Sequence, residues 1–421
     1  MTTSLALTIE QIGERARSAS RSLAQATSAE KNFALEAIAN RIERCADLLL
    51  SENGADLQAG AEKGLSSAML DRARLTPKGI EAIANSVRRV IDLEDPVGKV
   101  LRQWSRPSGL KISKVRVPIG VIGMIYESRP NVTSDAASLC LKSGNAVILR
   151  GGSESIRSNT ALAGAVSSGC KQAGLPEFSA QLVPSTERAA VTLMAQLDRY
   201  IQLIIPRGGR SLIETVTSSA RMPVIKHYDG ICAIYVDRKA NAEMARALVV
   251  NGKCQRPSVC NSIETLLVHE EIAPRFLPEC ANALWERGVE LRGDPLVRQI
   301  LGSRVKAATD EDWRTEFLDL VLAVKIVKSL EEAADHIDAN GSHHSDAIVT
   351  DDRPAAELFL QKVDSAAVFW NASTRFNDGG EFGFGAEIGI STDRLHARGP
   401  MGLEELTSYK YLVEGTGQVR T

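Results

Sequence analysis

The sequence of 421 residues lacks most features that mark secreted or membrane-spanning proteins. Its seven cysteines are odd in number and contain neither a CxxC pair nor a zinc-finger spacing, which argues against a disulfide framework. No run of about 18 apolar residues occurs, and Met1–Leu7 has no signal-peptide pattern. We therefore expect reduced thiols, a cytoplasmic location, no export signal and no membrane span.

Charge of one sign and aromatic residues are also scarce. Lys and Arg total 50 against 52 for Asp and Glu, the formal net charge is -2, and aromatic residues make up 5%. Such a balance creates no long-range field for nucleic acid or anionic lipid, and few rings are available to stack on bases. Nucleic acid and membrane are therefore not expected partners.

The order of the predicted elements indicates an α/β protein with two or three domains. Apolar residues at helical spacing and helix caps predict an all-helical segment from Thr8 to about Val100. From Val115 onward, short buried strands alternate with helices as far as Ser211. This alternation predicts a doubly wound parallel sheet whose ligands bind beyond the carboxyl ends of the strands.

A hairpin and a C-terminal strand stand apart from this alternation. The turn Ser105–Gly109 separates Val100–Leu101 from Leu110–Val117, and the segment Tyr409–Val413 predicts another short strand. We expect this last strand to pair with the hairpin or with another subunit.

A second α/β region begins near Val224 and contains the stretch Asn251–Val268. It places Cys260 between a predicted helix, Ala242–Val250, and a predicted buried strand, Ile263–Val268. Near Lys253 and Arg256, a thiol in such a loop is expected to have a lowered pKa and to act as a nucleophile. The alternative is that Cys260 is a small buried apolar residue.

Two glycine turns and one histidine pair are further candidate sites. Arg150-Gly151-Gly152-Ser153 and Arg207-Gly208-Gly209-Arg210 place backbone NH groups and arginine where phosphate binds, although each is also compatible with an ordinary turn. The loop Asn340–Asp346 contains His343 and His344, but neighbouring residues rarely chelate one ion, so we expect no metal site. The segment from Glu316 to Val327 predicts a pair of buried strands.

Long motifs resemble one known family. They are Arg116–Gly123, Tyr126–Thr133, Leu139–Ala146, the Cys260 stretch, Asn340–Ile348, Phe384–Thr392 and Leu395–Pro400. Through them nearly the whole chain resembles the gamma-glutamyl phosphate reductase (glutamate-5-semialdehyde dehydrogenase) family of the aldehyde dehydrogenase superfamily. The resemblance implies a doubly wound cofactor-binding domain, an α/β catalytic domain and a small oligomerisation element.

The resemblance also implies a reaction: NADPH-dependent reduction of L-glutamyl 5-phosphate to L-glutamate 5-semialdehyde and phosphate, in proline biosynthesis. Cys260 matches the family nucleophile, which forms a thioester with the acyl group, and Asn131 matches the superfamily's oxyanion-hole asparagine. Cys254 matches no functional position and is expected to pack. The upstream glutamate 5-kinase is expected to be a separate chain and a possible partner.

Other site residues follow from the same resemblance. Arg150 stands where the superfamily usually has a lysine near the adenosine ribose, and an arginine there favours NADP through its 2′-phosphate. Glu316 resembles the glutamate that holds the nicotinamide ribose. Arg375 and Arg398 are candidates for the substrate carboxylate or the departing phosphate. Hydrolytic relatives carry Glu-Leu-Gly-Gly where this chain has His227–Gly230, so the water-activating glutamate is missing.

The predicted domains are an NADP-binding domain over 1–229 that is interrupted by the hairpin at about 100–117, a catalytic domain over 230–403, and an oligomerisation tail over 404–421. A homo-oligomer is expected. Two other functions stay open: a CoA-acylating or other semialdehyde dehydrogenase, and a catalytically silent NADP-binding or scaffold protein.

Overall fold

The computed structural model describes residues 2–420, which form two compact units. The first unit runs to Lys226 and also includes Gly383–Gly389 and the chain from Met401. The second unit consists of His227–Phe382 and Ile390–Pro400. The segment from Gly383 to Gly402 is thus divided between the units, whereas the predicted catalytic domain over 230–403 includes all of it.

Helices form the first part of the first unit, as predicted. Their bounds are α1 Thr2–Leu23, α2 Ser28–Arg44, α3 Ala46–Glu62, α4 Ser67–Ala73 and α5 Pro77–Ile91. α2 begins with a capping box in which Thr27 and Glu30 exchange hydrogen bonds. α5 begins as the sequence predicts, because Thr76 caps it and Pro77 occupies its first turn, where no intrahelical NH donor is needed.

A four-stranded parallel sheet follows these helices in the first unit. Its elements are β3 Val121–Tyr126, α6 Asn131–Lys142, β4 Ala146–Gly151, α7 Ile156–Gln172, β5 Ala180–Leu182, α8 Ala189–Ala195, β6 Leu203–Arg207 and α9 Arg210–Ser219. The strand order is β5-β4-β3-β6, so the chain moves outward from β3 in one direction and then returns to its other side. The doubly wound prediction is confirmed. The direction reverses between β3 and β6, where such sheets bind ligands.

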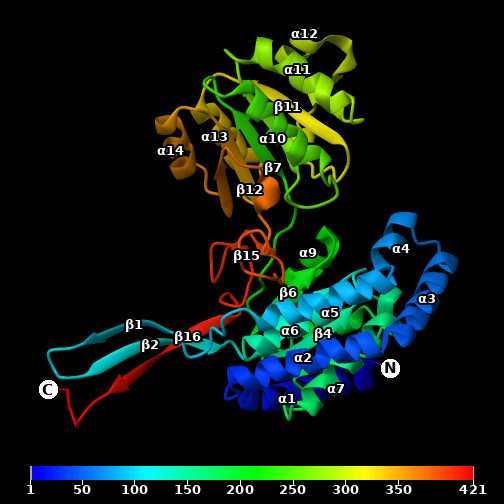
Figure 1. The fold of residues 1–421 in the computed structure, drawn as a ribbon, viewed down its shortest axis with the longest axis vertical. Helices are drawn as coiled ribbons and strands as arrows, with labels where there is room; N and C mark the ends of the chain where they lie inside the picture. The colour runs from blue at the N-terminus through cyan, green and yellow to red at the C-terminus, as the bar shows by residue number, and fades with distance from the viewer. Residues whose placement is uncertain (1, 421) are drawn as a thin grey trace. The chain divides into compact units, whose positions relative to one another are not determined.

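A separate three-stranded antiparallel sheet contains the predicted hairpin. β1 Val100–Ser105 pairs with β2 Lys111–Pro118, and β2 pairs along its length with β16 Thr407–Glu414. Figure 1 shows these three strands side by side. The prediction that the tail pairs with the hairpin is confirmed. Most of β16 after Thr407 is exposed, including Tyr409, Tyr411 and Val413.

The second unit contains a seven-stranded sheet in the order β10-β9-β11-β8-β7-β12-β13, and every neighbouring pair is parallel. Its strands are β7 Cys232–Val236, β8 Ile263–His269, β9 Glu290–Gly293, β10 Lys306–Ala307, β11 Val321–Val327, β12 Ser345–Val349 and β13 Ala367–Trp370. Its helices are α10 Ala242–Cys254, α11 Ala273–Trp285, α12 Pro295–Leu301, α13 Leu330–Asn340 and α14 Arg353–Lys362. The short strands β14 Ile390–Ser391 and β15 Gly399–Pro400 pair with each other.

Each face of this sheet is covered by helices, as expected for parallel strands. One apolar cluster joins the strands to α10, α11 and α12, and the other joins them to α13 and α14. One predicted detail is wrong: Glu316–Val327 contains a single strand, β11, because Leu318 has a φ of 54° and interrupts the extended backbone before Val321. Among residues 2–420, no helix is long and apolar enough to cross a membrane.

Candidate active site

The amino-terminal edge of the seven-stranded sheet brings together three residues that are distant in sequence. His227 precedes β7, Cys260 precedes β8 and His344 directly precedes β12. Because the parallel strands lie in the order β8-β7-β12, the segments that lead into them are neighbours. One ligand atom of each side chain, Sγ of Cys260 and a ring nitrogen of each histidine, lies within 4.8 Å of the other two.

Cys260 lies in a half-buried turn between α10 and β8, as the sequence predicts. Its carbonyl oxygen accepts a hydrogen bond from Sγ of Cys232 at 3.2 Å. A Cβ atom at Gly230 would lie 2.0 Å from this same oxygen, so only glycine allows the two segments to approach so closely. Burial raises the pKa of the Cys232 thiol well above its usual range. Cys232 therefore stays protonated, and Cys260 is the candidate nucleophile.

Both histidines are oriented by hydrogen bonds at Nδ1. In His227 this nitrogen lies 2.9 Å from the carbonyl oxygen of Ile390, which can only accept, so Nδ1 carries the proton. In His344 it lies 2.8 Å from Oγ of Ser345. The rings of His227 and His344 meet edge to face with centroids 5.5 Å apart. The sequence did not predict this pairing; the only signal was that a histidine replaces the glutamate of hydrolytic relatives.

Lys253 does not act on Cys260 in the way the sequence suggested. Its Nζ lies 2.5 Å from Oε2 of Glu264, and neither side chain is exposed. Burial lowers the pKa of Lys253, and the carboxylate partner opposes that effect. Lys253 therefore belongs to a buried pair that joins α10 to β8. Cys254 is half-buried, and burial raises the pKa of its thiol, as expected for a packing residue.

Of the two predicted substrate arginines, Arg375 is the one near the nucleophile. Burial lowers the pKa of Arg375, while the negative charge available at Cys260 opposes this effect. Its Nε donates to Oε1 of Gln255 at 2.8 Å, which aims the guanidinium along the Cys260 loop. Arg398 instead forms an ion pair with Asp364, and its Nη2 donates to the Asp364 carbonyl at 2.6 Å.

Glu316 lies near the nucleophile. Its Oε1 accepts a hydrogen bond from the NH of Gly230 at 2.9 Å, and Gly230 directly contacts Cys260. Burial raises the pKa of Glu316, although the Gly230 NH and the charge of His344 oppose the shift. Glu316 is thus linked through Gly230 to the cysteine loop.

The other predicted residues lie in the first unit. Asn131 is exposed at the start of α6, and its Nδ2 donates to Oδ2 of Asp135 at 2.8 Å. Burial raises the pKa of Asp135 to about 6, and the bond from Asn131 opposes that shift. One hydrogen of the Asn131 amide is therefore bonded to Asp135, and the second hydrogen is the one that an oxyanion would accept.

Three of the predicted cofactor residues, Arg150, Gly208 and Gly209, lie at the carboxyl ends of β4 and β6 in the four-stranded sheet. Gly208 and Gly209 follow β6, and the Gly209 NH donates to Oε2 of Glu127, which follows β3, at 2.9 Å. A carboxylate therefore already occupies one NH group that the sequence offered to phosphate. Arg150, at 6% exposure, donates from Nη2 to the carbonyls of Thr186 and Glu187, each at 3.4 Å. Its guanidinium is largely enclosed, whereas the predicted contact with a 2′-phosphate requires an accessible guanidinium.

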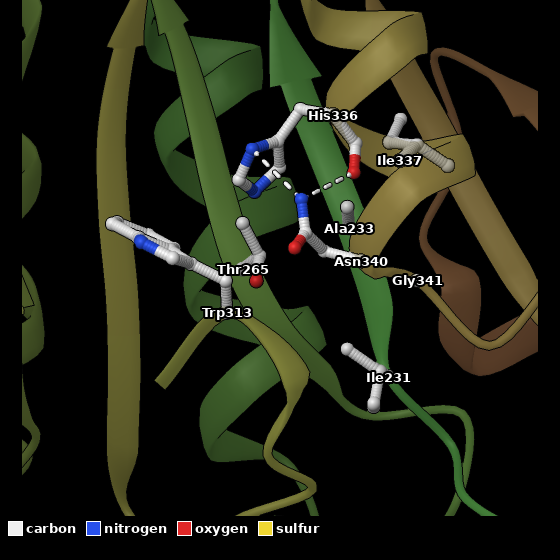
Figure 2. A pocket seen from close by; sticks show the side chains of 8 residues that line it. All are labelled: Ile231, Ala233, Thr265, Trp313, His336, Ile337, Asn340 and Gly341. Carbon is white, nitrogen blue, oxygen red and sulfur yellow. Dashed lines mark hydrogen bonds between the residues drawn. The ribbon is translucent and has the colours of Figure 1, made fainter. Parts of the chain in front are cut away.

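A polar pocket in the second unit is too small for a substrate. Figure 2 shows His336 and Asn340 facing Thr265 and Trp313 around a cavity of about 10 Å³, room for one water molecule. Burial lowers the pKa of His336 to about 4, and Asn340 contacts its Nδ1 at 3.4 Å. His336 is thus a neutral packing histidine, and the Cys260 cluster is the better candidate site.

The chain is similar to known proteins along its whole length. The model of the aldehyde dehydrogenase family matches residues 2–311. The chain is 53% identical over 416 residues to the gamma-glutamyl phosphate reductase of Moorella thermoacetica, covering 99% of each chain. It is 55% identical over 425 residues to the gamma-glutamyl phosphate reductase of Opitutus terrae, covering 100% of each. The crystal structure of gamma-glutamyl phosphate reductase from Thermotoga maritima superimposes with a TM-score of 0.96 at 45% identity, covering 98% of this chain and 100% of that one.

Proposed function

The chain belongs to the gamma-glutamyl phosphate reductases of the aldehyde dehydrogenase family, and from this we infer that it reduces L-glutamyl 5-phosphate to L-glutamate 5-semialdehyde and phosphate, a step of proline biosynthesis. It is therefore an oxidoreductase that uses a nicotinamide cofactor. The observation that carries the mechanism is the half-buried Cys260, held on a turn at the edge of the sheet with Arg375 in electrostatic range.

Cys260 is the nucleophile in this proposal. Its thiolate attacks the acyl carbon, the carbon–oxygen bond to phosphate breaks, and phosphate leaves with the electron pair of that bond and takes up a proton. A thioester on Cys260 remains. NADPH, when bound, supplies the hydride that reduces the thioester carbon. Expulsion of the thiolate then releases the aldehyde and restores Cys260.

Developing oxyanions require donors that are already in place. We assign this role to the Asn131 amide, oriented by Asp135, and to the backbone NH of Cys260. Loss of one such donor typically costs about 3 kcal/mol of transition-state stabilisation. Arg375 balances the negative charge of the departing phosphate in this scheme. Arg398 is assigned to the substrate's α-carboxylate. In this role its guanidinium exchanges Asp364 for the substrate carboxylate.

NADP rather than NAD is the proposed cofactor. The reversal point between β3 and β6 fits a dinucleotide, because parallel sheets bind ligands there and the Gly208-Gly209 turn lies at the end of β6. Arg150 is assigned to the 2′-phosphate, because its positive charge lies near this edge, although its guanidinium must become more exposed to reach a ligand. Glu316, beside the cysteine loop, is assigned to the nicotinamide ribose.

The proposed domains follow the predicted scheme: an NADP-binding domain to about residue 229, a catalytic domain to about 403, and a tail from 404 that completes the three-stranded sheet. The exposed side chains of β16 support a homo-oligomer through this sheet. A cytoplasmic location and a transient contact with glutamate 5-kinase, which would supply the labile acyl phosphate, belong to the same proposal.

The reverse reaction tests the function directly. NADP⁺ reduction is followed after adding glutamate semialdehyde with phosphate, with CoA, or with neither. We expect reduction only with phosphate; reduction that needs CoA would instead establish an acylating aldehyde dehydrogenase. Cys260→Ala should abolish turnover and retain NADPH binding, and Cys254→Ser is the matched control that should stay active. An active Cys260→Ala variant would refute the mechanism.

A further inference from the structure

The cluster of Cys260, His227 and His344 carries an inference beyond reduction of an acyl phosphate. Its three donor atoms, one sulfur and two imidazole nitrogens, lie within 4.8 Å of one another and come from three different loops. Thiolate and imidazole are the ligands that Zn²⁺ prefers, whereas Mg²⁺ and Ca²⁺ prefer oxygen. The chemistry of the set therefore points to a thiophilic divalent ion.

The hydrogen bonds behind the cluster are those of a metal site. A histidine that binds a metal usually donates its other ring NH to a carbonyl or another oxygen, which fixes the ring and the tautomer. His227 donates from Nδ1 to the Ile390 carbonyl, and Nδ1 of His344 lies 2.8 Å from Oγ of Ser345, a hydroxyl that can accept from it or donate to it. In both rings Nε2 is then the nitrogen that would serve as the ligand. This second shell is an observation separate from the spacing of the donor atoms.

The distances allow an ion to be bound with little movement. Zn–S and Zn–N bonds of about 2.3 and 2.0 Å in a tetrahedron place donor atoms roughly 3.5 Å apart. The donor atoms, at most 4.8 Å apart, would approach by about 1.3 Å or less. His227 is half-buried with its Nδ1 held by Ile390, and His344 is fully buried, so both rings have defined positions. The fourth position would be filled by water, as in other three-ligand zinc sites.

The charges around the cluster act in both directions. The carboxylate of Glu316 interacts electrostatically with His344 and favours a cation nearby. The guanidinium of Arg375 acts on Cys260 and disfavours one. These opposing charges suit an ion that binds reversibly and dissociates when free zinc is scarce, rather than a permanent structural ion.

We propose that Cys260, His227 and His344 form a regulatory site for Zn²⁺, which occupies the nucleophile and reversibly stops the reductase. Binding releases the proton of the Cys260 thiol and forms a zinc–sulfur bond, which withdraws negative charge from the sulfur and blocks its approach to the acyl carbon. The inhibitory consequence rests on the proposed role of Cys260; the binding itself does not.

Zinc binding is measured on the full chain by competition with a chromophoric chelator, and activity is measured in parallel at buffered free Zn²⁺. We expect one ion per chain, loss of activity with the same concentration dependence, full recovery with EDTA, and no effect of Mg²⁺. Co²⁺ should give the visible absorption of a tetrahedral site and a sulfur-to-cobalt charge-transfer band, which Cys260→Ser should abolish.

Variants of the histidines locate the site. His344→Gln and His227→Gln should each lower the affinity for Zn²⁺ about tenfold or more, because each removes one ligand. His343→Gln, at the neighbouring position of the same loop, and Cys254→Ser are controls that should bind Zn²⁺ as the unmodified protein does. Unchanged zinc affinity in both ligand variants, or loss of binding in Cys254→Ser, would overturn the site. If the protein is an active reductase but binds no zinc, this inference alone is overturned. If the protein has no reductase activity even after EDTA has removed all zinc, the proposed function is overturned.

Discussion

Replacing Lys253 with methionine should make the stability of the second unit strongly dependent on pH. The change removes the cation that lies 2.5 Å from Glu264 and leaves that carboxylate fully buried. Burial already raises the pKa of Glu264 from 4.5 to about 7, although Lys253 opposes the shift. Without Lys253 the pKa should be at least as high. Breaking a buried pair in this way typically costs about 3–5 kcal/mol.

The sign of the pH dependence follows from proton binding. A folded carboxyl whose pKa is raised holds its proton more tightly than the unfolded chain, so its contribution is present below about pH 4.5 and is lost as pH rises to about 7. At about 1.36 kcal/mol per pKa unit, the interval between these values corresponds to about 3 kcal/mol. The Lys253→Met variant should therefore lose about 1.4 kcal/mol of unfolding free energy for each pH unit in this window.

Urea unfolding from pH 5 to 7.5 tests the magnitude. Fluorescence reports mainly on the second unit, which contains Trp285, Trp313 and Trp370. The double variant Lys253→Met/Glu264→Gln is the matched control, because it has the same methionine but no carboxyl to titrate. If the single and double variants show the same pH dependence, Glu264 does not titrate in the folded protein and the reasoning is wrong.

Three further predictions concern the site and the sheet. His227→Glu should raise the rate of NADP⁺ reduction in the absence of phosphate by about 100-fold or more, because it places a general base beside the thioester. His227→Gln is the control and should not raise this rate, so equal phosphate-independent rates in the two variants would contradict the prediction. Arg150→Met should raise the KM for NADPH about 10- to 100-fold and leave the KM for NADH nearly unchanged, because a charged hydrogen bond is worth about 1.5–3 kcal/mol. An equal rise in both KM values would show that Arg150 does not recognise the 2′-phosphate. Tyr411→Glu should shift the protein toward smaller species in analytical ultracentrifugation, because Tyr411 is 54% exposed on β16, and Thr416→Glu beyond the strand is the control; an unchanged sedimentation coefficient would exclude this sheet as the interface.

The sequence by itself determined the local parts of this protein. Thr76 and Pro77 predict the start of α5, because capping and proline geometry act within one turn. The alternation of strands and helices predicts the doubly wound sheet, and the polar turn before an apolar run places Cys260 ahead of a buried strand. Each of these inferences depends on interactions between residues that are close in the chain.

Only the tertiary structure decided which distant residues meet. The order β8-β7-β12 brings His227 and His344 to Cys260, and no local pattern encodes the order of parallel strands. The same holds for Lys253: its place near Cys260 in sequence suggested a partner for the thiol, but the packing of α10 on β8 pairs it with Glu264. Strand order and side-chain burial arise from the whole core, and they determine which neighbours in sequence become neighbours in space.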